Sequence, residues 1–295
     1  MIATTSRPST SGSAARGSAP VAATAAHPVL RALASRPTPA VMGVLNVTPD
    51  SFSDGGKFIA PEHALAQARR MIAEGADIID IGAESTRPYG SQPISADEER
   101  ERLRPVLAEI VALGIPVSID SMKAPVVGWA LDQGAAIAND VWGLQRDPDM
   151  AGLVAKRQAP VIIMHNRDEA DAGIDIMRDI ADFFARSLAI AAKAGISPDH
   201  IVLDPGIGFG KTQEQSITVL ARLDELAVFN LPLLVGASRK RFIDSITPST
   251  PDQRLGGSIA AHVIAANSGA RIIRTHDVAE TVQALRVTAA IGDKR

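Results

Sequence analysis

Apolar runs and helix-like patterns alternate along the chain from residue 40 onward. Eight runs are rich in Val and Ile, have the length of strands, and mostly lack the alternation of a sheet with one wet face. Continuous apolar runs of this kind predict strands buried on both faces, as in a parallel sheet. The eight runs are residues 41–46, 76–82, 115–120, 135–139, 159–164, 200–204, 231–236 and 270–275.

Helices are predicted between these runs. Ser95 is followed three residues later by Glu98, the spacing of a capping box, and Gly114 is expected to end that helix. The segment 250–253, Thr-Pro-Asp-Gln, predicts another helix start, with proline at the first position. Eight strands, each followed by a helix, predict a (β/α)₈ TIM barrel. A doubly wound open sheet is the alternative, but no G-x-G-x-x-G follows the first run.

Polar residues recur where the apolar runs stop. In a barrel, the carboxyl ends of the strands carry the functional residues, so this recurrence is expected of an active site. Each residue taken alone also has a structural interpretation, as a helix cap, a turn former or part of a solvated basic face. The positions are Asn46, Glu84 to Pro88, Asp120, Asn139 and Asp140, His165 and Asn166, Asp204 to Lys211, Ser238 to Lys240, and Arg274 to Asp277.

The loop after the first run, residues 46–56, combines Pro, Gly, Asp and Ser with a single phenylalanine, Phe52. Such a composition cannot continue a strand and predicts a loop. Loops held on a rigid strand end often carry reactive groups, so this segment is a candidate functional loop.

Composition narrows the class of protein. The chain has 295 residues, 46% hydrophobic and 21% charged, which suits one barrel-sized globular domain. The net charge of −3 offers no basic surface for nucleic acid. The absence of cysteine excludes disulfides and thiolate metal sites. No apolar run approaches the ~20 residues of a membrane span, so a membrane is not expected as a partner. Because of the net charge, nucleic acid is not expected as a partner either.

The first 38 residues differ from the remainder. They are rich in Ala, Ser, Thr and Pro, contain several Arg, and precede the first acidic residue, Asp50. This composition predicts a disordered extension, with an organelle transit peptide as the alternative. Residues 39–295 are predicted to form the barrel domain.

Four of the strand-end residues suit a flat heterocycle that bears amino and oxo groups. Asp120, Asn139, Asp204 and Lys240 together offer acceptors for ring N–H groups and donors for ring oxygen or nitrogen. Polar groups are costly when left unpaired in a cleft of low dielectric, so a ligand is expected to complete them.

A second set suits an anion. Arg274, His276 and Arg87 offer donors to phosphate oxygens. Asn46 offers a neutral oxygen to a Mg²⁺ ion that keeps most of its waters and the phosphate oxygens.

Seven motifs, in order and at barrel-like spacing, resemble the dihydropteroate synthase family of pterin-binding barrels. The resemblance covers residues 40–291. The motifs are Asn46 to Gly56, Ser85 to Pro88, Ile119 to Ser121, Asn139 to Val141, Leu203 to Lys211, Gly236 to Lys240, and Arg274 to Val278. The resemblance implies transfer of the 7,8-dihydropterin-6-ylmethyl group from its diphosphate ester to 4-aminobenzoate. It also implies Mg²⁺ as cofactor, a homodimer, and, since no second enzyme domain is fused, a cytoplasmic stand-alone enzyme.

The resemblance assigns roles residue by residue. The pterin is held by Asp120, Asn139, Asp204 and Lys240, with Met164 and Val141 against its face. Asn46 binds Mg²⁺, Arg274 and His276 hold the diphosphate, and Ser238 is a further substrate-binding residue. The aminobenzoate site is shaped by Thr86, Arg87, Pro88, Phe52 and Phe209, and catalysis is assigned to Asp50, Phe52, Asp54, Asp120 and Lys240.

A dissociative, SN1-like displacement is the mechanism that these groups favour. Arg, His and Mg²⁺ would neutralise the departing diphosphate, and the electron-rich pterin would stabilise a cation at the methylene, helped by Asp120. The nucleophile is a neutral aromatic amine and needs no strong base. The loop of residues 46–56 (the first loop) and the loop that contains Ser85 to Pro88 (the second loop) are expected to close over the site and exclude water.

Two departures and two rival functions accompany this resemblance. Arg241 stands where many relatives have Ser, and Asn166-Arg167-Asp168 replaces a more usual turn, so the details of the aminobenzoate and diphosphate sites stay open. The rivals are a methyltransferase that passes a methyl group from a reduced folate to a corrinoid protein, and a pterin-binding paralogue without activity. Neither rival needs both the loop of residues 46–56 and a set of side chains that binds diphosphate.

Overall fold

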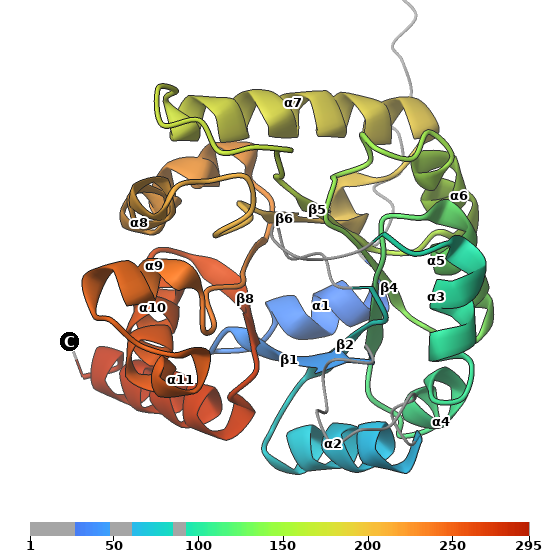
Figure 1. Cartoon of the computed structure of the whole chain (residues 1–295), viewed down its shortest axis with the longest axis horizontal. Coiled ribbons are helices and arrows are strands. Elements are labelled where there is room, and N and C mark those ends of the chain that lie inside the picture. The colour runs from blue at the N-terminus through green and yellow to red at the C-terminus, as the bar shows by residue number, and fades with distance from the viewer. Residues whose placement is uncertain (1–26, 48–60, 85–92, 295) are drawn as a thin grey trace, which may run out of the picture.

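The structure, a computed structural model, describes residues 27–47, 61–84 and 93–294. Eight parallel strands close into a barrel in chain order, with β8 beside β1, and helices surround it (Figure 1). The predicted (β/α)₈ TIM barrel is confirmed. The strands are β1 (Ala40–Asn46), β2 (Ile78–Gly82), β3 (Val117–Asp120), β4 (Ile137–Asp140), β5 (Val161–Met164), β6 (Ile201–Asp204), β7 (Leu233–Val235) and β8 (Ala270–Thr275).

The described helices follow the strands around the outside of the barrel, except α1, which precedes β1. They are α1 (Pro28–Ala34), α2 (Pro61–Ala73), α3 (Ala96–Leu103), α4 (Leu107–Val111), α5 (Ala124–Asp132), α6 (Met150–Arg157), α7 (Ile176–Ala194), α8 (Gln213–Ala221), α9 (Arg241–Ile246), α10 (Leu255–Asn267) and α11 (Val278–Gly292). Short 3₁₀ turns are η2 (Pro198–His200), η3 (Leu223–Phe229) and η4 (Pro251–Gln253). No helix in these described ranges is long and apolar enough to cross a membrane.

The barrel interior changes character along its axis. Its amino-terminal part is a buried apolar cluster that includes Ile78, Ile137, Ile162, Val202 and Ile272. Side chains alternate between the two faces of a strand, so the residue two positions further on also points inward. Those second positions are Asp80, Asn139, Met164, Asp204 and Arg274. An apolar floor thus passes into a polar layer at the carboxyl ends of the strands.

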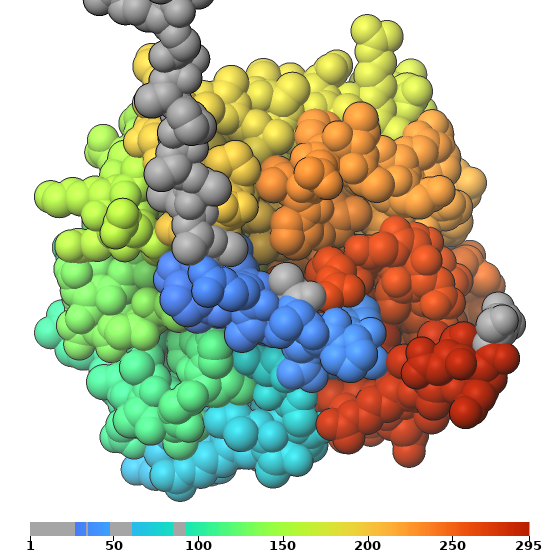
Figure 2. Space-filling view, turned by 180° about the vertical axis from the view of Figure 1, so that it is seen from behind, coloured from blue at the N-terminus to red at the C-terminus, as the bar shows by residue number. Residues whose placement is uncertain are grey.

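Helix α1 closes the amino-terminal end of the barrel. Leu30 and Leu33 are each 8% exposed and join the apolar cluster of the interior. Figure 2 shows this helix, in blue, across the middle of that face. The structure therefore differs from the sequence prediction for residues 28–34, which are helical because two leucines one turn apart have an apolar face to cover. Residues 1–26 lie outside the described part of the chain.

The two predicted helix starts are found, with differences. The Ser95 hydroxyl accepts from Glu98 N at 3.1 Å, as in a capping box, but Glu98 pairs with Arg102 at 2.6 Å. The single helix predicted to reach Gly114 is divided into α3 and α4, because Pro105 between them has no N–H to donate. The 250–253 box is complete, but it caps the 3₁₀ turn η4, and α10 begins at Leu255.

Candidate active site

The predicted pterin residues come together in one hollow at the carboxyl ends of the strands. Eight predicted site residues line it, with Gly206, Ile207 and Gly236. The eight are the six predicted for the pterin, together with Phe209, predicted for the aminobenzoate, and Arg274, predicted for the diphosphate; the six are Asp120, Asn139, Val141, Met164, Asp204 and Lys240. The eight come from six different strand ends, so only the closed barrel brings them together.

Arg274 is held by two carboxylates in this hollow. Its Nε donates to Asp80 Oδ2 at 2.6 Å, and one Nη donates to Asp120 Oδ2 at 2.8 Å. Burial disfavours the charge, but Asp80 and Asp120 raise the pKa of Arg274 above its ordinary value. The guanidinium is therefore a permanent cation, and it is already paired inside the hollow predicted for the pterin.

Asp80 belongs to the candidate site, although sequence reasoning did not single it out. It is fully buried and also accepts from Asn139 Nδ2 at 3.2 Å, so it orients both this amide and Arg274. With its Nδ2 turned to Asp80, Asn139 keeps a carbonyl oxygen for a ligand donor. An acidic residue inside an apolar run, two positions after Ile78, is the signal that would have found it.

Asp120 has one carboxylate oxygen committed and one without a partner among the described residues. Oδ2 accepts from Arg274, while Oδ1 is buried and makes no hydrogen bond there. Burial, together with the nearby Asp80, raises the pKa of Asp120 to about 7, and Arg274 opposes the rise. An orphaned buried oxygen is costly, so this one is suited to accept from a ligand.

Asp204 ends β6 and is fixed by the turn that follows. Its Oδ1 accepts from Gly206 N at 2.7 Å, and burial raises its pKa to about 6. Gly206 has φ +66° and approaches the carbonyl oxygen of His165 so closely that a Cβ would lie 2.0 Å away. Only glycine fits there, so the turn after β6 depends on this residue.

Lys240 and Phe209 face each other across the hollow. Lys240 Nζ lies 4.1 Å from the centroid of the Phe209 ring, within range of a cation–π contact. Lys211 stabilises the turn that carries Phe209. Its Nζ donates to the carbonyl oxygens of Gly206 and Phe209 at 2.9 and 3.1 Å.

His276 and Ser238 form a pair beside the hollow. Ser238 Oγ lies 3.0 Å from His276 Nδ1 and accepts from His276 N at 3.2 Å. Burial, with the cations Arg274 and Arg239 nearby, lowers the pKa of His276 to about 3. In this state the imidazole is neutral, so it offers a hydrogen bond rather than a charge.

Side-chain contacts hold the loop that follows β5, which begins at His165. His165 is fully buried, and its Nε2 lies 3.0 Å from Asp179 Oδ2, which also pairs with Arg167 at 3.0 Å. Asp168 pairs with Arg146 at 2.9 Å on the surface. The burial and hydrogen bonds of His165 agree with the structural interpretation that each strand-end residue also has.

Several predicted residues lie elsewhere or outside the described ranges. Asn46 is half-buried at the end of β1, and Arg241 is exposed at the start of α9. Those outside the described residues are Asp50, Phe52, Asp54, Thr86, Arg87 and Pro88.

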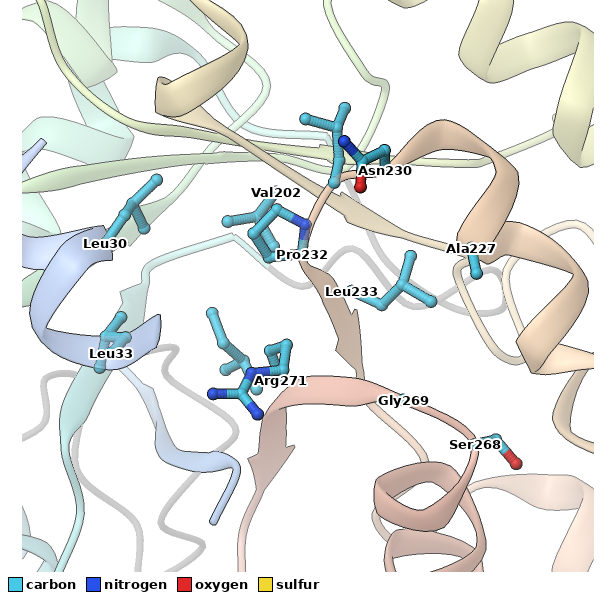
Figure 3. Close-up of a pocket in the computed structure, with 12 residues that line it drawn as sticks. Leu30, Leu33, Val202, Ala227, Asn230, Pro232, Leu233, Ser268, Gly269 and Arg271 are labelled. Carbon is cyan, nitrogen blue, oxygen red and sulfur yellow. The ribbon is translucent and has the colours of Figure 1, made fainter. Parts of the chain in front are cut away.

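A second hollow, of about 350 Å³, lies at the opposite end of the barrel. Leu30 and Leu33 of α1 face Val202, Pro232 and Arg271 across it (Figure 3). It is mostly apolar and lacks converging polar groups, whereas catalysis in barrels takes place at the carboxyl ends of the strands. We therefore place the active site in the polar hollow.

Comparison with known proteins agrees with this geometry. A model of the pterin-binding enzyme family matches residues 42–276. Dihydropteroate synthase of Bacillus subtilis is 41% identical over 269 residues, which are 91% of this chain and 94% of the relative. The Clostridium difficile enzyme, solved in the presence of pteroic acid, has a TM-score of 0.83 at 47% identity and covers 86% of this chain and 97% of its own.

The Xanthomonas albilineans enzyme was solved with 4-aminobenzoic acid. It has a TM-score of 0.83 at 42% identity and covers 86% of this chain and 93% of its own. A further structure from that organism holds 7,8-dihydropteroate. On fold and sequence, the chain belongs to the dihydropteroate synthases of the pterin-binding enzyme family.

Proposed function

We propose that the polar hollow binds the pterin of (7,8-dihydropterin-6-yl)methyl diphosphate for transfer to 4-aminobenzoate. The products are 7,8-dihydropteroate and diphosphate, a step of folate biosynthesis. The observation that carries the residue assignment is the convergence of Asp120, Asn139, Asp204 and Lys240 on one hollow. The ligands of the Xanthomonas albilineans structures, 4-aminobenzoic acid and 7,8-dihydropteroate, support the two ends of the reaction.

The pterin would be recognised by the hydrogen-bonding groups of the hollow that can still accept from or donate to a ligand. Asp204 and the carbonyl oxygen of Asn139 accept from the ring N–H and exocyclic amino groups, and Lys240 donates to ring oxygen or nitrogen. Met164 and Val141 line the same hollow and cover a face of the ring. Donors of the ligand favour the ionised form of Asp204, against the burial that raises its pKa.

Asp120 takes the electrostatic part in the displacement. Diphosphate leaves with the electrons of the carbon–oxygen bond, and positive charge develops on the methylene and the pterin ring. A preorganised carboxylate beside the ring stabilises that charge where water is scarce. The aromatic amine then attacks the methylene and loses a proton. The atom available for this role is the buried Oδ1 of Asp120, which has no hydrogen-bond partner within residues 27–47, 61–84 and 93–294.

The diphosphate is assigned to Arg274, Ser238 and His276, with Mg²⁺ held partly by Asn46. No three His, Cys, Asp or Glu side chains in the described ranges lie close enough to hold a metal ion. A neutral amide oxygen alone fits a Mg²⁺ that takes its other ligands from diphosphate and water. When bound, Mg²⁺ would neutralise charge on the leaving diphosphate. His276, which its lowered pKa keeps neutral, would reach the diphosphate through a single ring N–H rather than through charge.

The aminobenzoate site is assigned to Phe209 and to residues of the first two loops. Phe209 lies at the rim of the hollow, with Lys240 over its ring. The roles of Phe52, Thr86, Arg87 and Pro88, and of Asp50 and Asp54 in catalysis, rest on the sequence resemblance. A cytoplasmic location rests on it as well.

A homodimer through α10 and α11 belongs to the same proposal. The two helices pack side by side (Figure 1) and carry Ile264, Val287 and Ile291, which are 50%, 53% and 58% exposed. Exposed large aliphatic side chains on two neighbouring helices favour an interface with a second copy.

Diphosphate release by the purified full-length chain tests the function. With Mg²⁺ present, release is expected only when both the pterin diphosphate and 4-aminobenzoate are supplied. A corrinoid methyltransferase would release none and would instead demethylate a methylated folate. A paralogue that only binds pterin would show binding by calorimetry without release. Either result would overturn the synthase assignment.

A further inference from the structure

Lys211 is a buried cation behind the turn that follows β6. It is 5% exposed and does not line the pterin hollow, whereas Gly206, Ile207 and Phe209 of the same turn do. Its Nζ donates to the carbonyl oxygens of Gly206 and Phe209, so one side chain holds the turn at two points. Lysine is rarely buried unless it is paired, and the proposed function assigns Lys211 no role.

A third hydrogen bond of this ammonium leads to the end of β5. Lys211 Nζ donates to His165 Nδ1 at 2.6 Å, and His165 Nε2 lies 3.0 Å from Asp179 Oδ2. Burial, with Lys211 nearby, lowers the pKa of His165 to about 3, so its ring is neutral, accepts at Nδ1 and donates to Asp179 through Nε2. Each N–H of the ammonium therefore has an acceptor, and Lys211 ties the turn after β6 to the loop after β5.

The backbone of the turn also packs directly against that loop. A Cβ at Gly206 would lie 2.0 Å from the carbonyl oxygen of His165, and a Cβ at Gly210 would lie 2.4 Å from the Cβ of Arg167. Gly210, like Gly206, has a positive φ, +53°, which a glycine adopts without strain. Two close glycine contacts and one buried cation therefore fix the turn against the neighbouring strand end.

Asp204 of the pterin hollow depends on this turn. Gly206 N donates to Asp204 Oδ1 at 2.7 Å, and the carbonyl oxygen of the same glycine accepts from Lys211. Burial raises the pKa of Asp204, while the hydrogen bond from Gly206 and three nearby cations oppose the rise. The three cations are Arg274, Lys240 and Lys211. Lys211 thus acts on Asp204 in two ways, through the position of the turn and through its positive charge.

The ammonium of Lys211 keeps its charge in the pH range where Asp204 titrates. Burial lowers the pKa of Lys211 to about 7, and the carboxylates of Asp204 and Asp179 oppose the fall. The cations Lys240 and Arg167 add to the fall. At pH 6 the ammonium is therefore still protonated, and its charge favours the ionised form of Asp204.

We propose that Lys211 is a positioning residue for Asp204, fixing the turn after β6 against His165 and holding a positive charge behind the carboxylate that binds the pterin. The inference deepens the proposed function and rests on it. Lys211 acts through Asp204 and the turn, and not by contact with a substrate. It keeps Asp204 in the place and in the ionised form in which it accepts hydrogen bonds from the pterin.

Lys211→Met tests this, because methionine keeps much of the stem and removes the charge. The affinity for bare pterin at pH 7, measured by calorimetry, should fall about tenfold or more, since small misplacements of binding groups are costly. The pH below which the affinity falls should also shift upward from that of the wild type, because losing the cation and the fixed turn raises the pKa of Asp204. A merely structural loss would lower the affinity by the same factor at every pH and leave this pH unchanged.

Lys193→Met is the matched control. Lys193 is exposed in the last turn of α7, so the same change there should keep both the affinity and the pH profile of the wild type.

Two variants of His165 provide the same test if Lys211→Met does not fold. His165→Leu removes the acceptor at Nδ1 and leaves one donor of the buried ammonium unpaired, so pterin affinity should fall with the same upward shift in pH. His165→Asn should recover most of the affinity, because the amide oxygen can accept in place of Nδ1.

The outcomes separate this inference from the function on which it rests. A wild type that binds no pterin, or releases no diphosphate, contradicts the proposed function. If the wild type binds pterin and a folded Lys211→Met or His165→Leu keeps its affinity, or loses affinity without the shift in pH, the positioning role is wrong.

Discussion

At the scale of single residues, the hollow is a balance of buried charges. Asp80, Asp120 and Asp204 stand around Arg274, and Lys240 closes the rim. Burial raises the pKa of Asp120 to about 7 and that of Asp204 to about 6. Both carboxylates are therefore poised to take up a proton near neutral pH. A ligand that donates hydrogen bonds draws them toward the ionised form.

Asp204→Asn should weaken pterin binding by about ten- to a hundredfold, the loss of one or two charge-assisted hydrogen bonds. Calorimetry with bare pterin measures this. Asp132→Asn, at an exposed residue paired with Arg157, is the control and should bind as the wild type does. Unchanged affinity in Asp204→Asn would show that the pocket is misassigned.

The same variant predicts a pH dependence. Because the pKa of Asp204 is about 6 without ligand and the pterin needs the carboxylate, wild-type affinity should fall below pH 6. The fall approaches about tenfold per pH unit for one titrating group. Asp204→Asn should flatten this part of the profile. A profile with the same slope in both proteins would contradict the role of Asp204.

Arg274→Met should destabilise the protein by about 3 kcal/mol, because it leaves two carboxylates buried without their cation. Urea denaturation measures the free energy of unfolding. Arg157→Met, the same change at an exposed pair, should cost about 0–1 kcal/mol. Adding Asp80→Asn to Arg274→Met should restore part of the stability, since one uncompensated charge is removed.

Pterin binding by Arg274→Met is where the structure changes the expectation. From the sequence, Arg274 serves the diphosphate alone, and bare pterin should bind almost normally. Its hydrogen bond with Asp120 at 2.8 Å, inside the pterin hollow, predicts that pterin affinity falls as well. Normal pterin binding by a folded Arg274→Met would contradict this.

At the scale of elements, α1 is the part least expected from the sequence. The composition of residues 1–38 predicts no structure, yet Leu30 and Leu33 cover the interior, and Arg36 pairs with Asp77 at 2.8 Å. A short amphipathic pattern is weak in an Ala- and Pro-rich background, and a helix of this length is stable only when packed. What decides its fold is the apolar end of the barrel, which lies elsewhere in the sequence.

Two truncated chains test α1. A chain starting at His27 should unfold at the same urea concentration as the full chain. A chain starting at Pro39 should unfold at a lower urea concentration, because the apolar end of the barrel loses the side chains of Leu30 and Leu33, each worth about 1.5–3 kcal/mol when buried. If both truncations behave alike, the domain boundary predicted at residue 39 is the right one.

At the scale of the whole molecule, the exposed aliphatic face on α10 and α11 predicts the dimer. Ile264→Lys should shift sedimentation from dimer to monomer, because it places a charge in the proposed interface. Val228→Lys is the matched control, since Val228 is 80% exposed on η3, outside this face. A wild type that sediments as a monomer would contradict the proposal.

The polarity of the barrel is a property of the whole molecule as well. The strands carry apolar residues near their starts and polar residues near their ends. The barrel interior is therefore aliphatic at its amino-terminal end and has a charged hollow at its carboxyl-terminal end. The residues that line the charged hollow come from several strand ends, and no single strand forms the site. Binding at one end therefore requires the closed sheet.

The sequence by itself determined the architecture and most of the residues that converge in the candidate site. Doubly buried strands and intervening helices are local patterns, so the strands were predicted to within a few residues and the barrel with them. The polar residues at strand ends, such as Asp120, Asn139 and Asp204, follow from that architecture.

Only the tertiary structure decided which charges meet. Arg274 reaches Asp80 across 194 positions of sequence and Asp120 across 154, and Lys123 reaches Glu84 across 39. Pairing energies depend on distance in space and on burial, and neither can be read from a linear pattern. Asp80 lies within an apolar run, so the sequence pattern alone did not indicate its pairing with Arg274. The apolar cluster on which α1 packs forms only when the strands close into the barrel.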